Sequence, residues 1–409
     1  MKAPIQSNQL RPAMAMPRAM KLLLRVLENL QRGSLVVMLP DRSVRKYSGR
    51  EPGTGAALNI HDYRCAAAII RGAEIGLAEA YRDGWCSTPD LTQLLAFAIE
   101  NEAALNKIFY ANPLANFAHR LVHWLRANSR RGSRKNISAH YDLSNDFYGL
   151  WLDPTMTYSA ALFDGNRPLD LKAAQEAKYQ RVIDRLNIDA GHHILEIGCG
   201  WGGFAEYAAR HVGAKITGIT LSQAQLDFGR RRIERAGLTD RVELKFCDYR
   251  DVAGSFDRIV SIEMFEAVGE RYWPDYFAVV ASRLNATGRA LVQTITIADQ
   301  LFAQYRVRVD FIQRYIFPGG MLPSPTIFVA EAKRAGLALM SQHFFGSDYA
   351  ETLRRWQHRF AQKKAELEAL GFDRAFQRLW QFYFCYCEAG FDSLRTDVMQ
   401  IELAPARGA

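Results

Sequence analysis

The chain has 409 residues, enough for two or more domains that each bury a hydrophobic core. Hydrophobic residues make up 49% and charged residues 23% of it, as is typical of a globular protein. The sequence has no uncharged apolar run long enough to span a bilayer and no secretory signal pattern, so we expect a cytoplasmic protein. Its six cysteines lack zinc-site spacing and are expected to be free thiols. The net charge of +9 favours an anionic partner, either nucleic acid or an acidic lipid surface.

The first 125 residues are expected to form a small α+β domain without a catalytic constellation of its own. Apolar residues recur at helical spacing in four segments, and two short alternating runs bounded by turn-forming residues predict strands. The expected helices lie at residues 19–30, 66–70, 77–81 and 91–99, and the expected strands at residues 34–39 and 56–60.

A strongly basic segment, residues 126–139, is expected to be the linker to a second domain at residues 140–409. Two explanations fit this charge run equally well. One is binding to the phosphates of lipid headgroups or nucleic acid, and the other is a solvated boundary segment that binds nothing. The basic residues are Arg126, Arg130, Arg131, Arg134 and Lys135.

The stretch ILEIGCGWGG, residues 194–203, predicts a buried strand and a tight glycine turn, followed by a helix from Phe204. Its G-x-G-x-x-G spacing also occurs in NAD-binding folds. Glu196 separates the two possibilities, because it would repel a pyrophosphate but attract the cationic amino-acid part of S-adenosylmethionine. The next predicted strand ends at Thr220 without the acidic residue that binds an NAD ribose. We therefore expect an S-adenosylmethionine site.

Around the glycine turn, apolar strands alternate with helices, which predicts a doubly wound, Rossmann-like α/β sheet with helices on both faces. Ligand sites should lie at the carboxyl ends of its strands. An aromatic segment with Pro and Gly, residues 306–323, is expected to be an insertion over a hydrophobic pocket. Strands are expected at residues 215–220, 242–246, 258–261 and 290–295, and helices at residues 171–186, 224–236 and 276–284.

Seven motifs, in this order, resemble the cyclopropane-fatty-acyl-phospholipid synthase family, which includes the mycolic acid cyclopropane synthases. They are HYDLSNDFY (residues 140–148), LDPTMTYS (152–159), LEIGCGWGG (195–203), ITLSQAQ (219–225), DYRD (248–251), SIEMFEAVG (261–269) and RYIFPGGMLPS (314–324). The glycine motif alone would indicate only a methyltransferase, whereas the ordered set is specific.

The resemblance implies an enzyme that transfers the methyl group of S-adenosylmethionine to the double bond of an unsaturated acyl chain of a membrane phospholipid, giving a cyclopropane ring. It implies a cytoplasmic protein that associates peripherally with the inner face of the membrane, with the N-terminal domain docking on lipid. It implies no nucleic-acid partner and leaves a homodimer open.

The family's cofactor pocket carries over to the motif positions of this chain. Thr220 and Gln225 can hydrogen-bond to ribose or adenine without adding charge, and Asp248 and Tyr249 are expected near the adenine. The implied cofactor-binding residues are Tyr158, Ser159, Glu196, Gly198, Cys199, Gly200, Thr220, Gln225, Asp248 and Tyr249.

In the family, a bound bicarbonate ion accepts the proton that the acyl chain loses, so bicarbonate is a second candidate cofactor. At two of its ligand positions this chain departs from the pattern, with Ala160 in place of a cysteine and Gln293 in place of a histidine. Aromatic faces are expected to stabilise the cationic intermediate, and Cys387 is expected to line the pocket. The candidate catalytic residues are Glu266, Tyr349, Ile295, Gln293, His140, Tyr315 and Cys387.

The two departures leave the product open. An alanine side chain offers no donor to an anion, and a neutral amide cannot titrate as an imidazole does. Proton loss from another carbon would then give a methyl- or methylene-branched chain in place of a ring. An RNA or small-molecule methyltransferase and a lipid-binding protein without catalysis remain the alternative classes.

Overall fold

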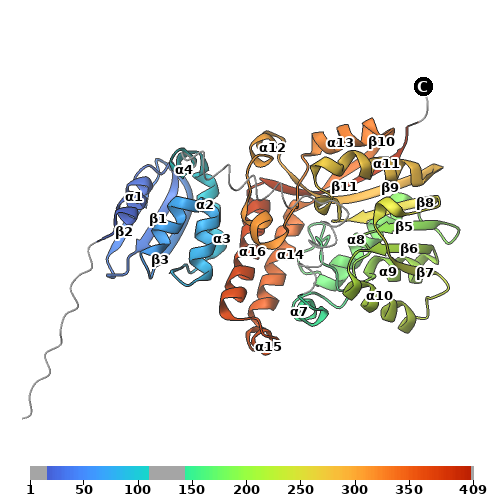
Figure 1. The fold of residues 1–409 in the computed structure, drawn as a ribbon, viewed down its shortest axis with the longest axis horizontal. Helices are drawn as coiled ribbons and strands as arrows, with labels where there is room; N and C mark the ends of the chain where they lie inside the picture. Colours follow the sequence, from blue (N-terminus) through green and yellow to red (C-terminus); the bar gives the residue numbers. More distant parts are fainter. Residues whose placement is uncertain (1–15, 110–142, 407–409) are drawn as a thin grey trace, which may run out of the picture. The chain divides into compact units, whose positions relative to one another are not determined.

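The computed structural model describes residues 16–109 and 143–406, and the chain forms two compact units, residues 1–111 and 112–409 (Figure 1). Each unit is described by itself. The expected linker at residues 126–139 lies outside the described residues. Every helix of the described ranges is too short or too polar to span a bilayer.

The first unit is built on a four-stranded sheet in which β1 runs antiparallel to β2 and parallel to β3. The buried Asn101 side chain joins the helical layer to the sheet, because it hydrogen-bonds to the backbone of Gln31 and Arg32. The α+β class expected for this unit is confirmed. In spatial order the strands are β2 (Val44–Ser48), β1 (Arg32–Met38), β3 (Glu51–Ile60) and β4 (Cys86–Ser87), and the helices are α1 (Arg18–Leu27), α2 (Arg64–Arg82), α3 (Leu91–Glu100) and α4 (Glu102–Phe109).

Helix α2 merges the two helices expected at residues 66–70 and 77–81. The interruption is local, because Ala73 has a non-helical backbone with φ 47°. A Cβ at Gly76 would lie 1.9 Å from the carbonyl oxygen of Ala68, so only glycine allows the two halves of α2 to approach this closely.

The second unit is a seven-stranded sheet of the expected doubly wound, Rossmann-like class. Strands β7, β6, β5, β8 and β9 are parallel, and β5 lies at the centre between β6 and β8. The glycine turn leaves the carboxyl end of β5, where ligand sites of such sheets lie. In spatial order the strands are β10 (Leu337–Phe344), β11 (Thr396–Pro405), β9 (Leu284–Ile297), β8 (Phe256–Ile262), β5 (His193–Ile197), β6 (Lys215–Thr220) and β7 (Val242–Phe246).

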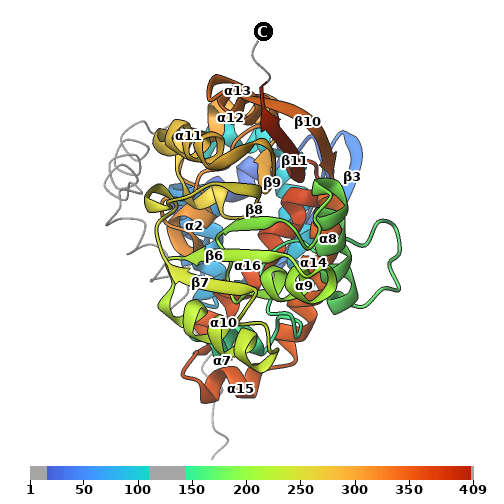
Figure 2. The ribbon, with the colours of Figure 1, turned by 90° about the vertical axis from the view of Figure 1, so that its right-hand side faces the viewer.

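Hydrophobic cores lie on both faces of this sheet, because its strands are apolar at successive positions. Ile194 faces a core with α8 (Leu171–Leu186), α9 (Gly203–Val212) and α10 (Gln223–Arg235). The next residue, Leu195, faces a core with α11 (Trp273–Arg283) and α13 (Pro325–Arg334). Figure 2 shows α8 and α9 on one side of the sheet and α11 on the other.

The sequence patterns did not predict β10 and β11. Strand β11 enters the sheet antiparallel between β9 and β10. Two long helices, α14 (Gly346–Ala361) and α16 (Arg374–Asp392), pack against each other. Their aromatic side chains join those of α7 (Asn145–Gly149) in one buried cluster, where Phe147 lies 5.0 Å from Trp380 between ring centroids. Most of the C-terminal aromatics are core residues, as expected.

The segment expected to be an insertion, residues 306–323, follows α12 (Asp299–Tyr305) and contains a π-helical turn, Ile312–Ile316. π-helical turns often occur at functional sites. The fully buried Phe311 packs on Phe382 of α16 with ring centroids 4.8 Å apart. Phe317 lies 6.3 Å from the ring of Tyr158, so the segment reaches the region of the glycine turn.

We predict that Gly218→Ala lowers the free energy of unfolding by about 1–3 kcal/mol, the usual cost of overpacking. A Cβ at Gly218 would lie 2.6 Å from Leu244 Cδ2 and 2.9 Å from Cys199 Cβ. Urea unfolding followed by tryptophan fluorescence measures the change. Gly149→Ala is the matched control, since nothing lies within 4 Å of a Cβ there. Equal losses in the two variants would contradict this packing.

Candidate functional site

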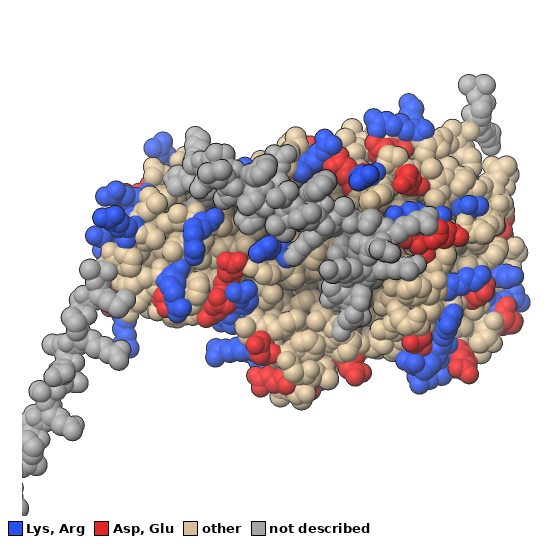
Figure 3. Space-filling model, viewed as in Figure 1, with Lys and Arg blue, Asp and Glu red and all other residues tan. Residues whose placement is uncertain are grey.

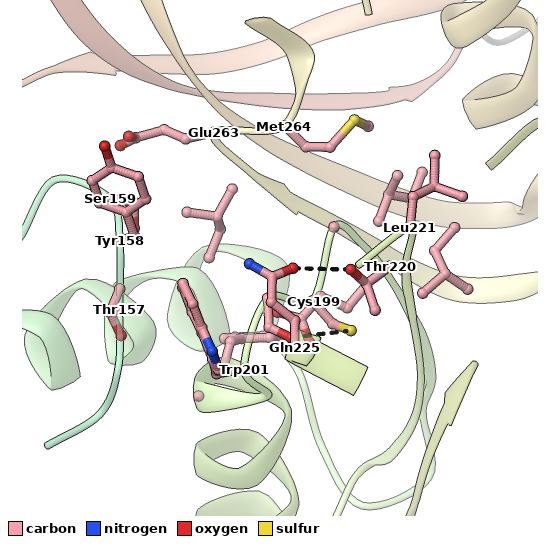
Figure 4. Close-up of a pocket in the computed structure, with 18 of the residues that line it drawn as sticks. Thr157, Tyr158, Ser159, Cys199, Trp201, Thr220, Leu221, Gln225, Glu263 and Met264 are labelled. Atoms are coloured by element: carbon pink, nitrogen blue, oxygen red, sulfur yellow. Dashed lines mark hydrogen bonds between the residues drawn. The ribbon is translucent and has the colours of Figure 1, made fainter. Parts of the chain in front are cut away.

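A cavity of about 150 Å³ lies at the carboxyl ends of β5, β6 and β8 (Figure 4). Figure 4 shows Thr220 and Gln225 on one side of it and Glu263 on another. The expected cofactor residues that line this cavity are Tyr158, Ser159, Glu196, Gly198, Cys199, Gly200, Thr220, Gln225 and Tyr249.

The glycine turn has the geometry that the sequence predicted. Gly198 and Gly200 have φ values of 84° and 50°, which side chains rarely tolerate. The backbone N–H groups of Gly198 and Cys199 both donate to the carbonyl oxygen of Ile219, at 3.0 and 2.9 Å, which fixes the turn against β6. A Cβ at Gly203 would lie 2.6 Å from the Tyr179 hydroxyl, so the first turn of α9 also requires glycine.

Glu196 is buried at the end of β5 and lines the cavity. Burial raises the pKa of its carboxyl well above the usual range, and the charge of Lys178 opposes that shift. Its Oε2 atom is buried and has no hydrogen-bond partner among the described residues. A cationic ligand would compensate this carboxylate, so the site fits the amino-acid part of S-adenosylmethionine.

Thr220 and Gln225 form the opposite wall. The Thr220 hydroxyl donates to Gln225 Oε1 at 3.0 Å and accepts from the Ser222 N–H at 3.1 Å. Asp248 is not among the residues that line the cavity, and Arg250 binds both of its carboxylate oxygens at 2.8 and 2.6 Å. The neighbouring Tyr249 does line it, so the pairing of Asp248 orients this segment.

Residues 157–164, here called the strap, line the cavity with Thr157, Tyr158 and Ser159 and are bound to helices of the second unit. Lys178 Nζ of α8 donates to Ser159 Oγ at 2.6 Å, and the hydroxyls of Tyr158 and Tyr383 are 2.8 Å apart. The backbone N–H of Phe163 donates to Asp348 Oδ2 of α14 at 2.7 Å. The strap is thus bound to α8, α14 and α16.

The carboxylate at the centre of the site belongs to Glu263, directly after β8. It accepts three hydrogen bonds: from the Ala160 N–H and Gln293 Nε2, both at 2.8 Å to Oε1, and from the Tyr349 hydroxyl, at 2.7 Å to Oε2. Burial raises the pKa of Glu263, and the charge of Lys178 and these hydrogen bonds oppose the shift. Backbone φ is 50° at Glu263, a left-handed conformation.

Glu266, the glutamate that the sequence resemblance pointed to, has other partners. Its Oε1 accepts from the Ile295 N–H at 2.5 Å and from the Thr294 hydroxyl at 3.0 Å. Burial and then the charge of Glu263 raise the pKa of Glu266 to about 8, so this carboxyl is mainly protonated at neutral pH. The groups expected around one anion therefore divide between two carboxyls, with Ile295 on Glu266 and with Gln293 and Tyr349 on Glu263.

The sequence reasoning did not single out Glu263, although it lies within the quoted motif SIEMFEAVG. One signal could have found it. Carboxyl ends of neighbouring parallel strands meet at one edge of a sheet, and Glu263 follows β8 directly beside the glycine turn of β5. Glu266 lies three positions further on, in a short 3-10 turn.

The remaining candidate catalytic residues have different surroundings. Tyr349 is buried, and its ring stacks on Phe391 with centroids 4.5 Å apart. Burial raises the pKa of the Cys387 thiol, which favours its protonated, less nucleophilic form. Tyr315 packs on Phe311, with ring centroids 5.8 Å apart. His140 lies outside the described residues.

Comparisons with known proteins show what this chain is similar to. A sequence profile of the family described as "Mycolic acid cyclopropane synthetase" matches residues 128–401. Tuberculostearic acid methyltransferase UfaA1 of Mycobacterium tuberculosis is 40% identical over 353 residues, covering 82% of this chain and 80% of that protein. Cyclopropane-fatty-acyl-phospholipid synthase of Escherichia coli is 32% identical over 338 residues, covering 81% and 84%.

Solved structures give the same result. The cyclopropane synthase MmaA2 from Mycobacterium tuberculosis has a TM-score of 0.62 at 30% identity, covering 66% of this chain and 98% of that chain. The mycolic acid cyclopropane synthase CmaA1, crystallised with SAH and CTAB, has a TM-score of 0.62 at 30% identity, covering 66% and 97%.

We predict that Glu196→Gln weakens binding of S-adenosylmethionine about tenfold to a hundredfold, since hydrogen bonds to charged groups contribute about 1.5–3 kcal/mol. Binding to the unaltered protein should release protons as the buried carboxyl ionises, and the variant should lose this release. Isothermal titration in buffers of different ionisation enthalpy measures both. Glu176→Gln, which removes an exposed ion pair with Lys172 on α8, is the control. Wild-type affinity in Glu196→Gln would refute the assignment.

Proposed function

This chain belongs to the mycolic acid cyclopropane synthetase family and is an S-adenosylmethionine-dependent lipid methyltransferase, and from this premise we propose which reaction it performs. The proposed substrate is the double bond of an unsaturated acyl chain of a membrane phospholipid. The proposed product is a methylene-branched acyl chain. The base is the carboxylate of Glu263, in place of a bound bicarbonate ion.

The observation that carries this proposal is the set of donors around Glu263. Three positions that correspond to bicarbonate ligands in the family, Ala160, Gln293 and Tyr349, all donate to the Glu263 side chain, Ala160 through its backbone N–H in place of the family's cysteine side chain. With these donors occupied, a second anion would lack partners and would lie beside a like charge. A base that is part of the chain also has a fixed position, which restricts the acyl hydrogen it can reach.

The cofactor, when bound, supplies a methyl group activated by a sulfonium. The π electrons of the acyl double bond would form the new C–C bond to this methyl group as its bond to sulfur breaks, with that electron pair remaining on the sulfur of neutral S-adenosylhomocysteine. The positive charge then lies on the adjacent acyl carbon. A hydride shift then moves the charge to the carbon that bears the methyl group. Glu263 accepts a proton from that methyl group, and the electrons of the broken C–H bond form the methylene double bond. A saturated methyl branch would require a separate reduction.

Aromatic faces near the strap can stabilise the acyl cation without trapping it. Tyr158 lies 5.4 Å from Trp356 between ring centroids, and Trp356 lies 6.1 Å from Tyr349. Phe317 stacks on Tyr158 from the inserted segment. These rings give the acyl chain an apolar environment that excludes water as a competing nucleophile.

A cyclopropane product is the second candidate. It requires the same methyl transfer, with ring closure when the methyl proton leaves. The 32% identity to the Escherichia coli cyclopropane-fatty-acyl-phospholipid synthase supports it. The 40% identity to UfaA1, whose name states methyl transfer and no ring, supports the branched product together with Glu263.

We propose that the first unit contacts the lipid surface. Its β1–β2 hairpin places Val36 opposite Lys46 and Met38 opposite Val44, so exposed apolar and basic side chains share one face. Figure 3 shows Lys and Arg side chains gathered on the visible face of this unit. Such a mixture suits an anionic membrane surface, where each basic residue contributes about 1 kcal/mol.

We predict that Glu263→Gln lowers turnover about 10²- to 10⁴-fold, the usual contribution of a general base. The enzyme is incubated with methyl-labelled S-adenosylmethionine and unsaturated phospholipid vesicles in buffer freed of bicarbonate, and mass spectrometry identifies the acyl product. The wild type should be fully active there and give the methylene-branched chain. A wild type that requires added bicarbonate, or an unimpaired Glu263→Gln, would sink the proposal.

Glu263→Gly is the companion variant, because glycine accepts the left-handed backbone and leaves a space among the three donors. We expect added bicarbonate to restore part of its turnover and to increase the share of ring product. Glu263→Gln, whose amide still fills that space, should not respond. If the two variants respond equally to bicarbonate, the anion does not take the place of the missing Glu263 carboxylate, and the proposal is contradicted.

A further inference from the structure

Lys178 of α8 is a fully buried lysine beside the cofactor cavity, and the reaction described above gives it no role. Its ammonium donates to Ser159 Oγ and to Gln175 Oε1, both at 2.6 Å, and lies 5.1 Å from the centre of the Tyr179 ring. Gln175 in turn donates to the Ser159 carbonyl oxygen at 2.8 Å. Lys178 and Gln175 therefore hold the hydroxyl and the carbonyl oxygen of Ser159 in the cavity wall.

The charge of Lys178 has no direct counter-ion, since no carboxylate oxygen of the described residues lies within 4.0 Å of its Nζ atom. Three buried carboxyls nevertheless interact with it at longer range: Glu263 after β8, Asp153 before the strap and Glu196 of β5. Burial raises the pKa of each of these carboxyls. Neutral hydrogen-bond partners fix the ammonium in place while its field acts on the acids around it.

Burying an ammonium costs several kcal/mol even after relaxation, and a leucine or methionine would pack into an apolar helix interface without that cost. Resting on the function proposed above, we propose that Lys178 is a positioning residue that keeps Glu263 ionised for proton transfer and fixes Ser159 against the cofactor. It does not contact the acyl chain. It acts through the electrostatic effect of its charge on Glu263 and through its hydrogen bond to the Ser159 hydroxyl.

The titratable neighbours determine the expected pH dependence. Glu263 is flanked by Lys178 of α8, Tyr349 of α14 and Glu266 of the 3-10 turn. Burial lowers the pKa of Lys178 to about 7, with the three carboxyls opposing this shift, so its charge is present below pH 7 and is lost above it. Below pH 7 the positive charge of Lys178 favours the ionised form of Glu263. Removing that charge should therefore have its largest effect on kcat in this pH range.

The test compares the wild type with Lys178→Met, which removes the charge, and Lys178→Gln, which removes the charge but keeps a polar end for its neighbours. We expect the acidic limb of the kcat profile, where Glu263 takes up a proton, to move upward by about one pH unit in both variants. Two folded variants with lower kcat but an unmoved acidic limb would overturn the proposal. Thermal melting confirms folding, and either folded variant is sufficient.

A second measurement does not depend on turnover. S-adenosylmethionine carries a sulfonium and SAH does not, so a buried ammonium near the cavity should disfavour the former. At pH 6 we expect Lys178→Met to bind S-adenosylmethionine, relative to SAH, several-fold more tightly than the wild type does. At pH 8.5 the ratio of the two Kd values should be the same in the variant and the wild type. An unchanged ratio at pH 6 would contradict a charge effect. A wild type that methylates no lipid would instead refute the proposed function.

Discussion

The Glu263 carboxylate connects four parts of the second unit at one point. It follows β8 and accepts hydrogen bonds from the strap at Ala160, from β9 at Gln293 and from α14 at Tyr349. A buried carboxylate without its donors is costly, so these segments are stable together in this arrangement only. The sheet edge that lines the cavity, the strap and helix α14 are thereby fixed relative to each other.

The parallel half of the sheet could be predicted from the sequence because its signals are local. Strands β6 and β7 have the predicted bounds, and the predicted glycine turn follows β5, with positive φ at Gly198 and Gly200. Strand β11 could not be predicted in this way. Its place between β9 and β10 depends on pairing with residues about a hundred positions away, as between Gln400 and Gln293, which its own sequence does not encode.

The members of the site could be predicted from the sequence more reliably than their hydrogen-bond partners. Nine of the ten expected cofactor residues line the cavity, whereas Asp248 is paired with Arg250 and does not line it. The two glutamates of SIEMFEAVG differ by three positions, and the left-handed backbone at Glu263 separates their directions. Motif matching cannot resolve such a turn, because it depends on contacts with β9 and α14 that form only in the folded chain. Lys178 was missed because an isolated lysine in a helical pattern indicates an exposed face. Its burial depends on contacts that form only in the folded chain.

Strand β11 has a consequence for how the protein is made. Gln400 Nε2 donates to Gln293 Oε1 at 3.0 Å, and the same amide of Gln293 orients its Nε2 toward Glu263. The strand that sets this orientation is the last element that the structure describes to leave the ribosome. A nascent chain can therefore form the β5 glycine turn and its neighbouring parallel strands while Gln293 still lacks this support. We expect the Glu263 hydrogen bonds to be complete only after β11 has been synthesised and has paired with β9, later than the edge formed by β5, β6 and β8.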